Sequence, residues 1–151
     1  MFDVSLVNTD NPKKLWDLYM KHAHIVMFVI DSSDRQSILS AKDDLHNSVL
    51  NHKDLHKNAC LLVIANKQDI EGCMTVLEII DILQLGKIKR KCHLQDVSII
   101  RGHGIQQGIQ WMERQMTNKF FKLDSPPIDL YVPSEEEIAQ RGQLTTRAKA
   151  L

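Results

Sequence analysis

The segment from Leu61 to Ile70, LLVIANKQDI, passes from apolar residues directly into four polar ones, and three of these have the chemistry of a ligand site. The carboxylate of Asp69 can accept two roughly parallel hydrogen bonds, one from a ring N–H and one from an exocyclic amine. Guanine presents that pair of donors at N1 and N2, whereas adenine does not. The aliphatic stem of Lys67 could lie over the purine face, and Asn66 could reach N7 or tie the loop to a neighbouring one. The alternative is a polar strand end that faces water.

Such a loop must follow a buried strand, and three segments have the character of strands. Residues 25–31 and 59–66 are continuous apolar runs rich in β-branched residues, which is typical of parallel strands buried on both faces. Residues 92–100, CHLQDVSII, form a weaker third candidate. In an open parallel sheet, ligands bind at the edge formed by the carboxyl ends of the strands, so the polar residues fall where binding is expected.

Helical patterns separate these strands. The first has a Ser- and Asp-rich start and periodic apolar residues at Ile38, Ala41, Leu45 and Val49. A capping box of Thr75 and Glu78 opens a second helix, which Gly86 is placed to end. The last follows the turn RGHG (101–104) and has an apolar stripe at Ile105, Ile109, Met112 and Met116, with Trp111 alongside. This alternation predicts an α/β fold with a parallel sheet flanked by helices.

Composition narrows the class of protein. The length of 151 residues is typical of one domain, and 19 basic residues balance 19 acidic ones, so no overall field favours nucleic acid or an anionic membrane. The three cysteines have no CxxC spacing, which suits a reducing compartment. No apolar run reaches the roughly 20 residues of a membrane span, and Phe2 stands where N-myristoylation requires Gly. We therefore expect a cytoplasmic protein without a membrane anchor of its own, peripheral to intracellular membranes only through partners.

Several motifs, in matching order and spacing, give the chain a family resemblance. The most specific are IDSSDR (30–35), ANKQD (65–69) and the final helix GIQQGIQWMERQM (104–116). With these motifs, residues 15–116 resemble the C-terminal two-thirds of an Arf-like small GTPase of the ADP-ribosylation factor family. The resemblance implies a P-loop GTPase-like sheet and a GTP/GDP switch that uses Mg²⁺. It also implies effector and regulator proteins as partners in intracellular membrane trafficking.

The resemblance also assigns site residues. Asn66, Lys67 and Asp69 match the guanine-specificity motif of the family. A later loop of the family gives a backbone N–H to the guanine O6, and the matching residues here are Ser98 and Ile99. Ser98 keeps the small polar position, whereas Ile99 replaces a small residue. Because the usual contact comes from the backbone, this substitution need not remove it, but a branched side chain would crowd the base.

The phosphate end of the family's site has no counterpart in this sequence. None of the six glycines begins or ends a G-x-x-x-x-G-K-[ST] segment, whose backbone, Lys and hydroxyl hold the phosphates and Mg²⁺. The Thr of switch I would precede Met1, and no catalytic Gln stands before Leu15. These observations suggest a truncated or degenerate member that lacks the P-loop strand and helix, with weak nucleotide binding, no metal ligands and no appreciable hydrolysis. The alternative is a nucleotide-free interaction module, or truncated isoform, that binds family partners.

Without the P-loop strand, one long apolar strand would lie at an edge of the sheet, which favours aggregation. We therefore predict that residues 2–7 pair with residues 25–30 through a helix at 15–21. The GTPase-like domain is predicted to cover 1–119 and a C-terminal extension 120–151, because three prolines and an acidic cluster follow residue 119. A second capping box, Ser134 with Glu137, predicts a short helix near 135–141.

Three further clusters each have a functional and a structural interpretation. His52 and His56, four residues apart, could bind a metal or could lie at a solvated helix end. The RGHG segment could be a phosphate-binding nest or a turn before the last helix. The basic segment GKIKRKC (86–92) could meet acidic lipid or a partner, or it could be a solvated loop.

Overall fold

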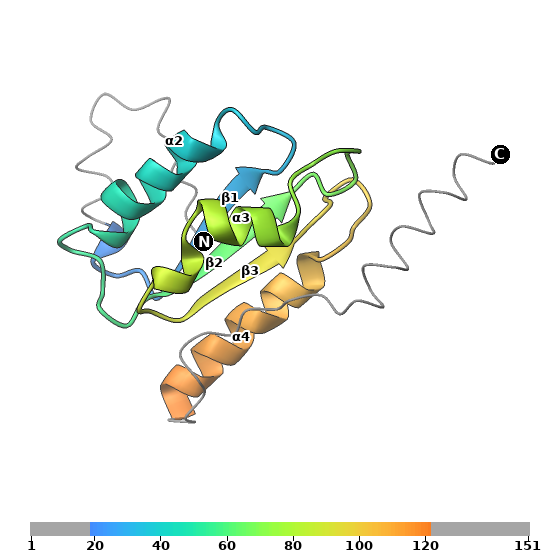
Figure 1. The fold of residues 1–151 in the computed structure, drawn as a ribbon. Coiled ribbons are helices and arrows are strands. Elements are labelled where there is room, and N and C mark those ends of the chain that lie inside the picture. The colour runs from blue at the N-terminus through green and yellow to red at the C-terminus, as the bar shows by residue number, and fades with distance from the viewer. Residues whose placement is uncertain (1–18, 122–151) are drawn as a thin grey trace.

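The computed structural model describes residues 19–121, which form a three-stranded parallel sheet with helices on both faces (Figure 1). The strands are β1 (Ile25–Asp31), β2 (Cys60–Asn66) and β3 (Cys92–Asp96), in the order β1-β2-β3. The register pairs Asp31 with Asn66, and Ala65 with Asp96, so the carboxyl ends of the strands lie together at one edge. The predicted class, an α/β protein with a parallel sheet flanked by helices, is confirmed.

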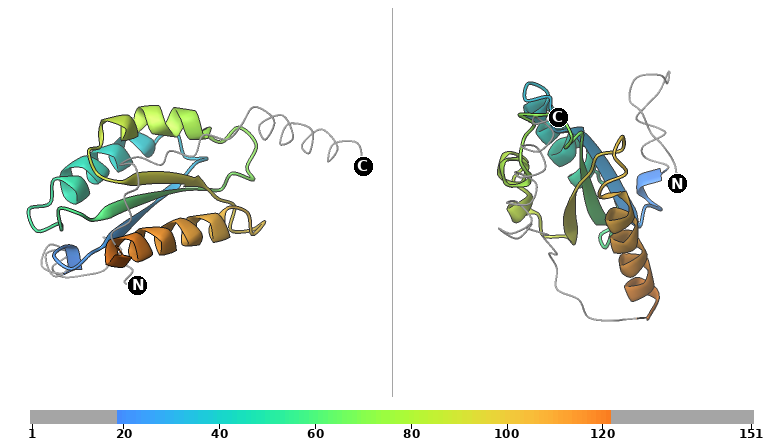
Figure 2. Two further views of the ribbon diagram at one scale, coloured as in Figure 1. Left: turned by 90° about the horizontal axis from the view of Figure 1, so that it is seen from below. Right: turned by 90° about the vertical axis from the view of Figure 1, so that its right-hand side faces the viewer.

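The helices form two outer layers, with the sheet between them (Figure 2). On one face, α2 (Ile38–Asp43) continues directly into η1 (Asp44–Leu50), a segment with the wider turns of a π-helix. The same face carries α3 (Val76–Ile82) and a short 3₁₀ turn, η2 (Leu85–Lys87). The opposite face is covered by α4 (Ile105–Phe121).

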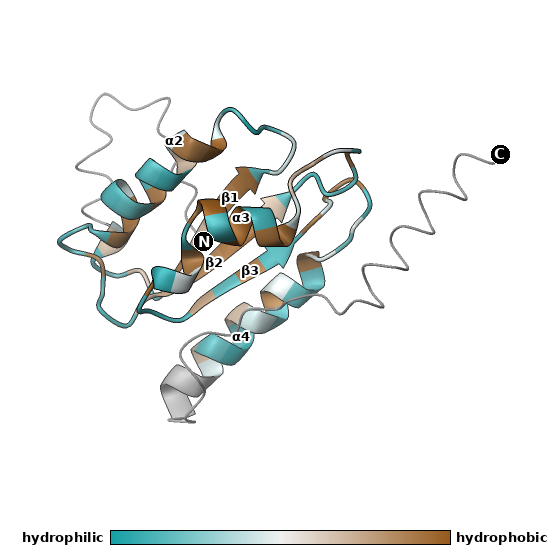
Figure 3. Ribbon diagram, viewed as in Figure 1, coloured by the Kyte–Doolittle hydropathy of each residue, from teal (hydrophilic) through white to brown (hydrophobic). Residues whose placement is uncertain are grey.

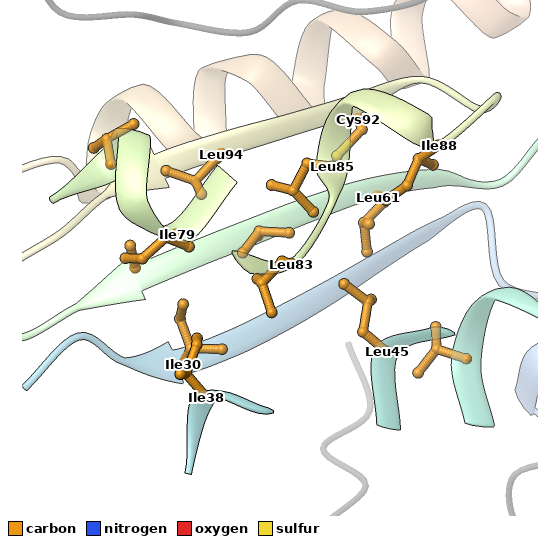
Figure 4. Packing of buried hydrophobic residues seen from close by; sticks show 14 of the residues in the cluster. Ile30, Ile38, Leu45, Leu61, Ile79, Leu83, Leu85, Ile88, Cys92 and Leu94 are labelled. Atoms are coloured by element: carbon orange, nitrogen blue, oxygen red, sulfur yellow. The ribbon is translucent and has the colours of Figure 1, made fainter. Parts of the chain in front are cut away.

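The main hydrophobic core lies between the sheet and the layer of α2, η1 and α3 (Figure 4). In β2, Leu61 and Val63 point into this core, whereas the intervening Leu62 points to the other face and packs with Trp111 of α4. Successive side chains of a strand point to opposite faces, so a strand covered on both must be apolar throughout. This explains the continuous apolar run of β2, which is brown along its length in Figure 3.

The start of α3 confirms the predicted capping box, but its end differs from the prediction. The Glu78 N–H donates to Thr75 Oγ1 at 3.2 Å, and the Thr75 N–H donates to Glu78 Oε2 at 2.7 Å. The helix ends at Ile82, and Gln84 then adopts a left-handed conformation with φ of 53°. The prediction that Gly86 ends the helix is therefore wrong, because Gln84 already turns the chain and Gly86 lies within η2.

The last helix, α4, forms as predicted, but it does not bury the predicted stripe. Ile105, Ile109 and Met116 are 38%, 45% and 37% exposed, whereas Trp111 is only 4% exposed. The helix instead approaches the sheet at Gly108, where an added Cβ would lie 3.5 Å from the nearest side chain of β2. A small residue permits this close approach, so the line of contact follows Gly108 and Trp111 and leaves larger apolar side chains outside.

The third strand is shorter than the predicted segment 92–100 and ends at Asp96. All five of its residues are buried, although three of them are polar. The ring of His93 stacks on that of Trp111 with centroids 5.2 Å apart, and Gln95 Nε2 donates to the Asp96 backbone oxygen at 3.1 Å. These polar contacts beneath α4 explain why the strand lacks the apolar run that identifies β1 and β2.

Several predictions concern residues outside the described range. These are the pairing of residues 2–7 with β1, most of the helix at 15–21, and the short helix near 135–141. The boundary between a domain at 1–119 and an extension at 120–151 also stays a prediction. Within residues 19–121, no helix combines the length and the apolar character needed to cross a membrane.

Candidate functional site

Three loops begin at the carboxyl ends of the strands, and these loops together with the last residue of β2 contain every residue that the sequence predicts for the base site. The arrowheads of β1, β2 and β3 lie at the same end of the sheet in Figure 1. Asn66 is the last residue of β2, and the loop that follows carries Lys67, Gln68 and Asp69. The loop after β3 carries Ser98 and Ile99. The Gln68 N–H donates to the Val97 backbone oxygen at 3.1 Å, so the two loops are joined through the backbone. The site is thus supported by the sheet on one side and by turns on the other.

Side chains of the β2 loop also bond to the β3 loop at two points. The hydroxyl of Ser98, which is only 2% exposed, donates to Asp69 Oδ1 at 2.5 Å. The Ile99 N–H donates to Asn66 Oδ1 at 3.4 Å, which is longer than a usual hydrogen bond between N–H and oxygen. The structure therefore brings four of the predicted residues into two cross-loop contacts.

The carboxylate of Asp69 is held ionised by this arrangement. The hydrogen bond from Ser98 lowers the pKa of the Asp69 carboxyl, and the positive charges of Arg101 and Lys67 lower it further. Ser98 donates to Oδ1, and a backbone hydrogen bond also lowers the pKa of this carboxyl. An ionised carboxylate has about four lone-pair sites, so one that is anchored at Oδ1 can still accept hydrogen bonds from a ligand.

Lys67 is paired with the carboxylate at the end of β1. Its Nζ lies 2.6 Å from Asp31 Oδ2, and its backbone φ of 65° is in the left-handed region that residues with a Cβ rarely adopt. The hydrogen bond from Lys67, together with those from Ser33, lowers the pKa of Asp31 to about 2. The ion pair fixes the lysine stem across the gap between the first two loops.

The sequence interpretation gave Asp31 no role. It stands within IDSSDR, a segment that contributed to the family resemblance, and it ends β1 at the level where Asn66 ends β2. That register was the available signal, because two residues paired at the ends of adjacent parallel strands bring their following loops together. The end of β1 thus places a carboxylate beside the two predicted loops.

The turn after Ser98 fixes the third loop. Ser98 and His103 exchange two backbone hydrogen bonds, at 3.1 and 3.0 Å, and Gly104 has a φ of 78°. A Cβ on Gly104 would lie 1.9 Å from the Asp96 backbone oxygen, so only Gly fits there. The geometry of RGHG is that of a tight turn joining β3 to α4. The side chain of Ile99 is 61% exposed, on the outer side of this turn.

The histidines considered as metal ligands lie apart from these loops. The two histidines considered as metal ligands lie in the loop between η1 and β2, where His56 stacks on His24 with ring centroids 6.1 Å apart. No group of three His, Cys, Asp or Glu residues within 19–121 is placed to hold a metal ion. The groups that these loops offer are a carboxylate that accepts hydrogen bonds, a side-chain amide and backbone N–H donors.

Comparison with known proteins decides the family. The model of the ADP-ribosylation factor family matches residues 1–116. The chain belongs to the ADP-ribosylation factor family. Its relatives include ADP-ribosylation factor-like protein 5A of Bos taurus, 39% identical over 113 residues, and of Homo sapiens, 38% identical over 113 residues. Each of these matches covers 74% of this chain and 61% of the relative, so the chain spans about three-fifths of the length of these relatives.

Membership of the ADP-ribosylation factor family makes this chain a relative of small GTPases. Proteins of the family in general bind GTP or GDP with Mg²⁺ and meet effector and regulator proteins. The 151 residues contain no G-x-x-x-x-G-K-[ST] segment, although the family match begins at residue 1. The residues predicted for a site in this chain are those that resemble the base-recognition motifs of the family.

Proposed function

We propose that this chain recognises the guanine base of GDP or GTP through the loops after β2 and β3. In this proposal Asp69 Oδ2, together with Oδ1, accepts hydrogen bonds from N1–H and the exocyclic amine of guanine. Ser98 anchors the carboxylate from behind with its 2.5 Å hydrogen bond. That contact carries the proposal, because it orients an ionised carboxylate toward the strand ends before any ligand arrives.

The neighbouring residues complete the proposed base site. The stem of Lys67 is fixed by its ion pair with Asp31 at 2.6 Å, which leaves its methylene groups to cover a purine face. The Ile99 N–H has only a long bond to Asn66, at 3.4 Å, so a base oxygen can share or replace that acceptor. Asn66 supports the loop through this bond.

Binding of a nucleotide to these 151 residues is expected to be weak. In P-loop GTPases the phosphates and Mg²⁺ are held by the glycine-rich loop, its Lys and its hydroxyl, and none of these is in the sequence. A base site without that loop supplies specificity with little affinity. For the same reason we expect no appreciable hydrolysis by this chain, since no water-positioning Gln accompanies the base site.

Isothermal titration with GDP and ADP tests the base site. The expected result is weak binding of GDP, a lower affinity for ADP, and loss of GDP binding in the Asp69→Ala variant. Because ADP carries the same phosphates, a preference for GDP isolates the base from general attraction of phosphate to lysines. Equal affinities for GDP and ADP, or no detectable heat with GDP at millimolar concentration, would contradict the proposal.

A second candidate function is a nucleotide-free interaction module that binds partners of the family. Apolar side chains gather on the α4 side of the sheet: Val29 of β1 is 57% exposed, and Ile109 of α4 is 45% exposed. Large exposed apolar side chains on neighbouring elements favour protein contacts. Absence of GDP binding, with a folded chain, favours this function over base recognition.

The cellular setting follows from the family and remains part of the proposal. We expect effector or regulator proteins as partners, a role in vesicle trafficking, and a cytoplasmic location with peripheral contact to intracellular membranes through those partners. The interaction of this chain with nucleic acid is not expected, because its formal charges balance.

A further inference from the structure

A second polar site lies at the opposite end of the sheet from the base site. It is a cavity of about 450 Å³ between the end of η1 and the segment that follows α3. Both segments lie away from the arrowheads in Figure 1, near the amino ends of the strands. Its volume falls within the range of about 300–1,000 Å³ that is typical of small-molecule pockets.

The cavity is strongly basic. Lys57, Lys87, Lys89 and Arg90 line it, and no Asp or Glu does. The three lysines are exposed, and none of them forms an ion pair with a described residue. Four positive charges without a carboxylate partner repel one another, and a bound anion would relieve that repulsion.

The fold, and not the sequence alone, gathers these charges. Gln84, with its left-handed φ of 53°, turns the chain after α3 so that the residues 87–90 border the cavity, and Lys57 comes from the loop before β2. Arg90 is held in place, since its Nη1 donates to the backbone oxygens of Ala59 at 3.1 Å and His56 at 3.5 Å. The cluster therefore combines one fixed guanidinium with three lysines that are free to close on a ligand.

His46 forms part of the cavity wall. Its Nε2 donates to the Leu83 backbone oxygen at 2.8 Å, which fixes the ring between η1 and the end of α3. Ile88, which is 6% exposed, supplies an apolar part of the lining. The site thus combines a hydrogen-bonded histidine and arginine with exposed lysine side chains.

We propose that this cavity binds a ligand with two or more phosphate groups, either as a soluble polyphosphorylated molecule or as the headgroup of a lipid. A phosphomonoester carries about 1.5 to 2 negative charges at neutral pH, so two or three phosphates match the four cations. Lysine ammonium groups bind phosphate as point charges, and arginine adds a planar fork. The site is independent of base recognition, because Asp69 lies at the other end of the strands.

The test is titration of the full 151-residue chain with inositol trisphosphate, a compact polyphosphate without a base. The Lys87→Glu/Lys89→Glu variant is expected to lose about tenfold or more in affinity, and binding should fall steeply with added salt. A matched control, Lys21→Glu/Arg114→Glu, changes net charge equally at exposed positions outside the cavity lining, and it should change affinity by less than about twofold. Equal losses of affinity in the two variants would overturn the proposal, because the net charge of the chain would then explain the binding.

A vesicle-binding experiment distinguishes a lipid headgroup from a soluble ligand as the source of the phosphates. Sedimentation with phosphatidylcholine vesicles, with and without phosphatidylinositol bisphosphate, identifies a lipid headgroup if the chain binds only the phosphorylated vesicles and inositol trisphosphate competes. Binding of the soluble probe alone identifies a soluble ligand. Failure to bind either probe would overturn the proposal.

Two controls separate this proposal from misfolding and from nucleotide binding. The single Lys57→Ala variant, at an exposed position, should lower affinity for the probe without changing the far-ultraviolet circular dichroism. The Asp69→Ala variant should bind inositol trisphosphate as the unmodified chain does, whatever its affinity for GDP. Loss of probe binding in Asp69→Ala would contradict a separate site.

Discussion

The two ends of the sheet are built in opposite ways. At the carboxyl end, charged and polar side chains are already paired across loops, as in the contacts of Asp69 with Ser98 and of Lys67 with Asp31. At the amino end, Lys57, Lys87 and Lys89 surround a cavity without an ion pair among the described residues. The carboxyl end is therefore arranged in advance for directional hydrogen bonds, whereas the amino end attracts negative charge with little directionality.

The largest expected effect is on the free energy of unfolding. It is tested by substituting one glycine at each end of the sheet, Gly104 and Gly86. In Gly104→Ala the new Cβ would clash with the Asp96 carbonyl at 1.9 Å, in a residue with φ of 78°, so we expect a loss of about 3 kcal/mol or more in the free energy of unfolding. In Gly86→Ala nothing lies within 4 Å of the added Cβ, and we expect a change within about 0.5 kcal/mol. Urea denaturation of both variants measures the difference. Similar losses in the free energy of unfolding for the two variants would contradict this expected difference between the two ends.

An intermediate effect, on the affinity for GDP, is expected when the hydroxyl that orients Asp69 is removed. Ser98→Ala deletes the hydroxyl that donates to Asp69 and that accepts from the Arg101 N–H at 3.2 Å. We expect affinity for GDP to fall about tenfold, because the carboxylate is no longer oriented. The pKa of Asp69 should rise in the same variant, since the hydroxyl is the main cause of its lowering. Titration calorimetry and carboxyl NMR measure the two effects.

The control for this variant is Ser48→Ala, which removes an exposed hydroxyl from η1. It should leave the GDP affinity and the pKa of Asp69 unchanged. An Asp69 pKa that is the same in Ser98→Ala as in the unmodified chain would mean that the cross-loop hydrogen bond is not formed in solution.

The smallest expected effect is on acid stability. The pKa of Asp31 is lowered from 3.8 to about 2 in the folded chain, mainly by the hydrogen bond from Lys67. A carboxyl with a lowered folded pKa stabilises the protein above its unfolded pKa, and this stability is lost as the pH falls from about 4 towards 2. Lys67→Met should therefore reduce stability near neutral pH and flatten its acid dependence, by a modest amount because the pair is partly exposed.

Free energies of unfolding between about pH 2 and pH 6 measure this effect. Lys87→Met is the matched control at the amino end, where the lysine has no carboxylate partner among the described residues. It should leave the acid dependence unchanged. An identical acid dependence in Lys67→Met and the unmodified chain would contradict the Lys67–Asp31 contact.

Local signals in the sequence predicted much of the fold. The strands β1 and β2 follow from their continuous runs of β-branched and aliphatic residues, and the start of α3 follows from the Thr75–Glu78 capping box, because these signals act within a few residues. The contact line of α4 could not be predicted in this way. Its position depends on Gly108 meeting β2, and a periodicity of apolar residues carries no information about such a close approach.

The candidate site was predictable to a similar degree. The chemistry of the NKQD segment suggested residues 66, 67 and 69, and the family resemblance added residues 98 and 99, whereas the partner of Lys67 required the register of β1 against β2. The basic cavity could likewise be predicted only in part from the sequence. The sequence displays the cluster 86–92, but only the fold brings Lys57 and the end of η1 to it.

The most direct test of base recognition is the nucleotide preference of Asp69→Asn. Asparagine keeps one acceptor for the ring N1–H, but its NH₂ group donates to the carbonyl at C2 of xanthine and opposes the amine at C2 of guanine. Titrations of the unmodified chain and the variant with GDP and xanthosine diphosphate give four affinities. We expect Asp69→Asn to prefer xanthosine diphosphate over GDP, the reverse of the unmodified chain, with a change of about tenfold or more in each affinity. An unchanged order of the two ligands in the variant would contradict the assignment of Asp69 to the base.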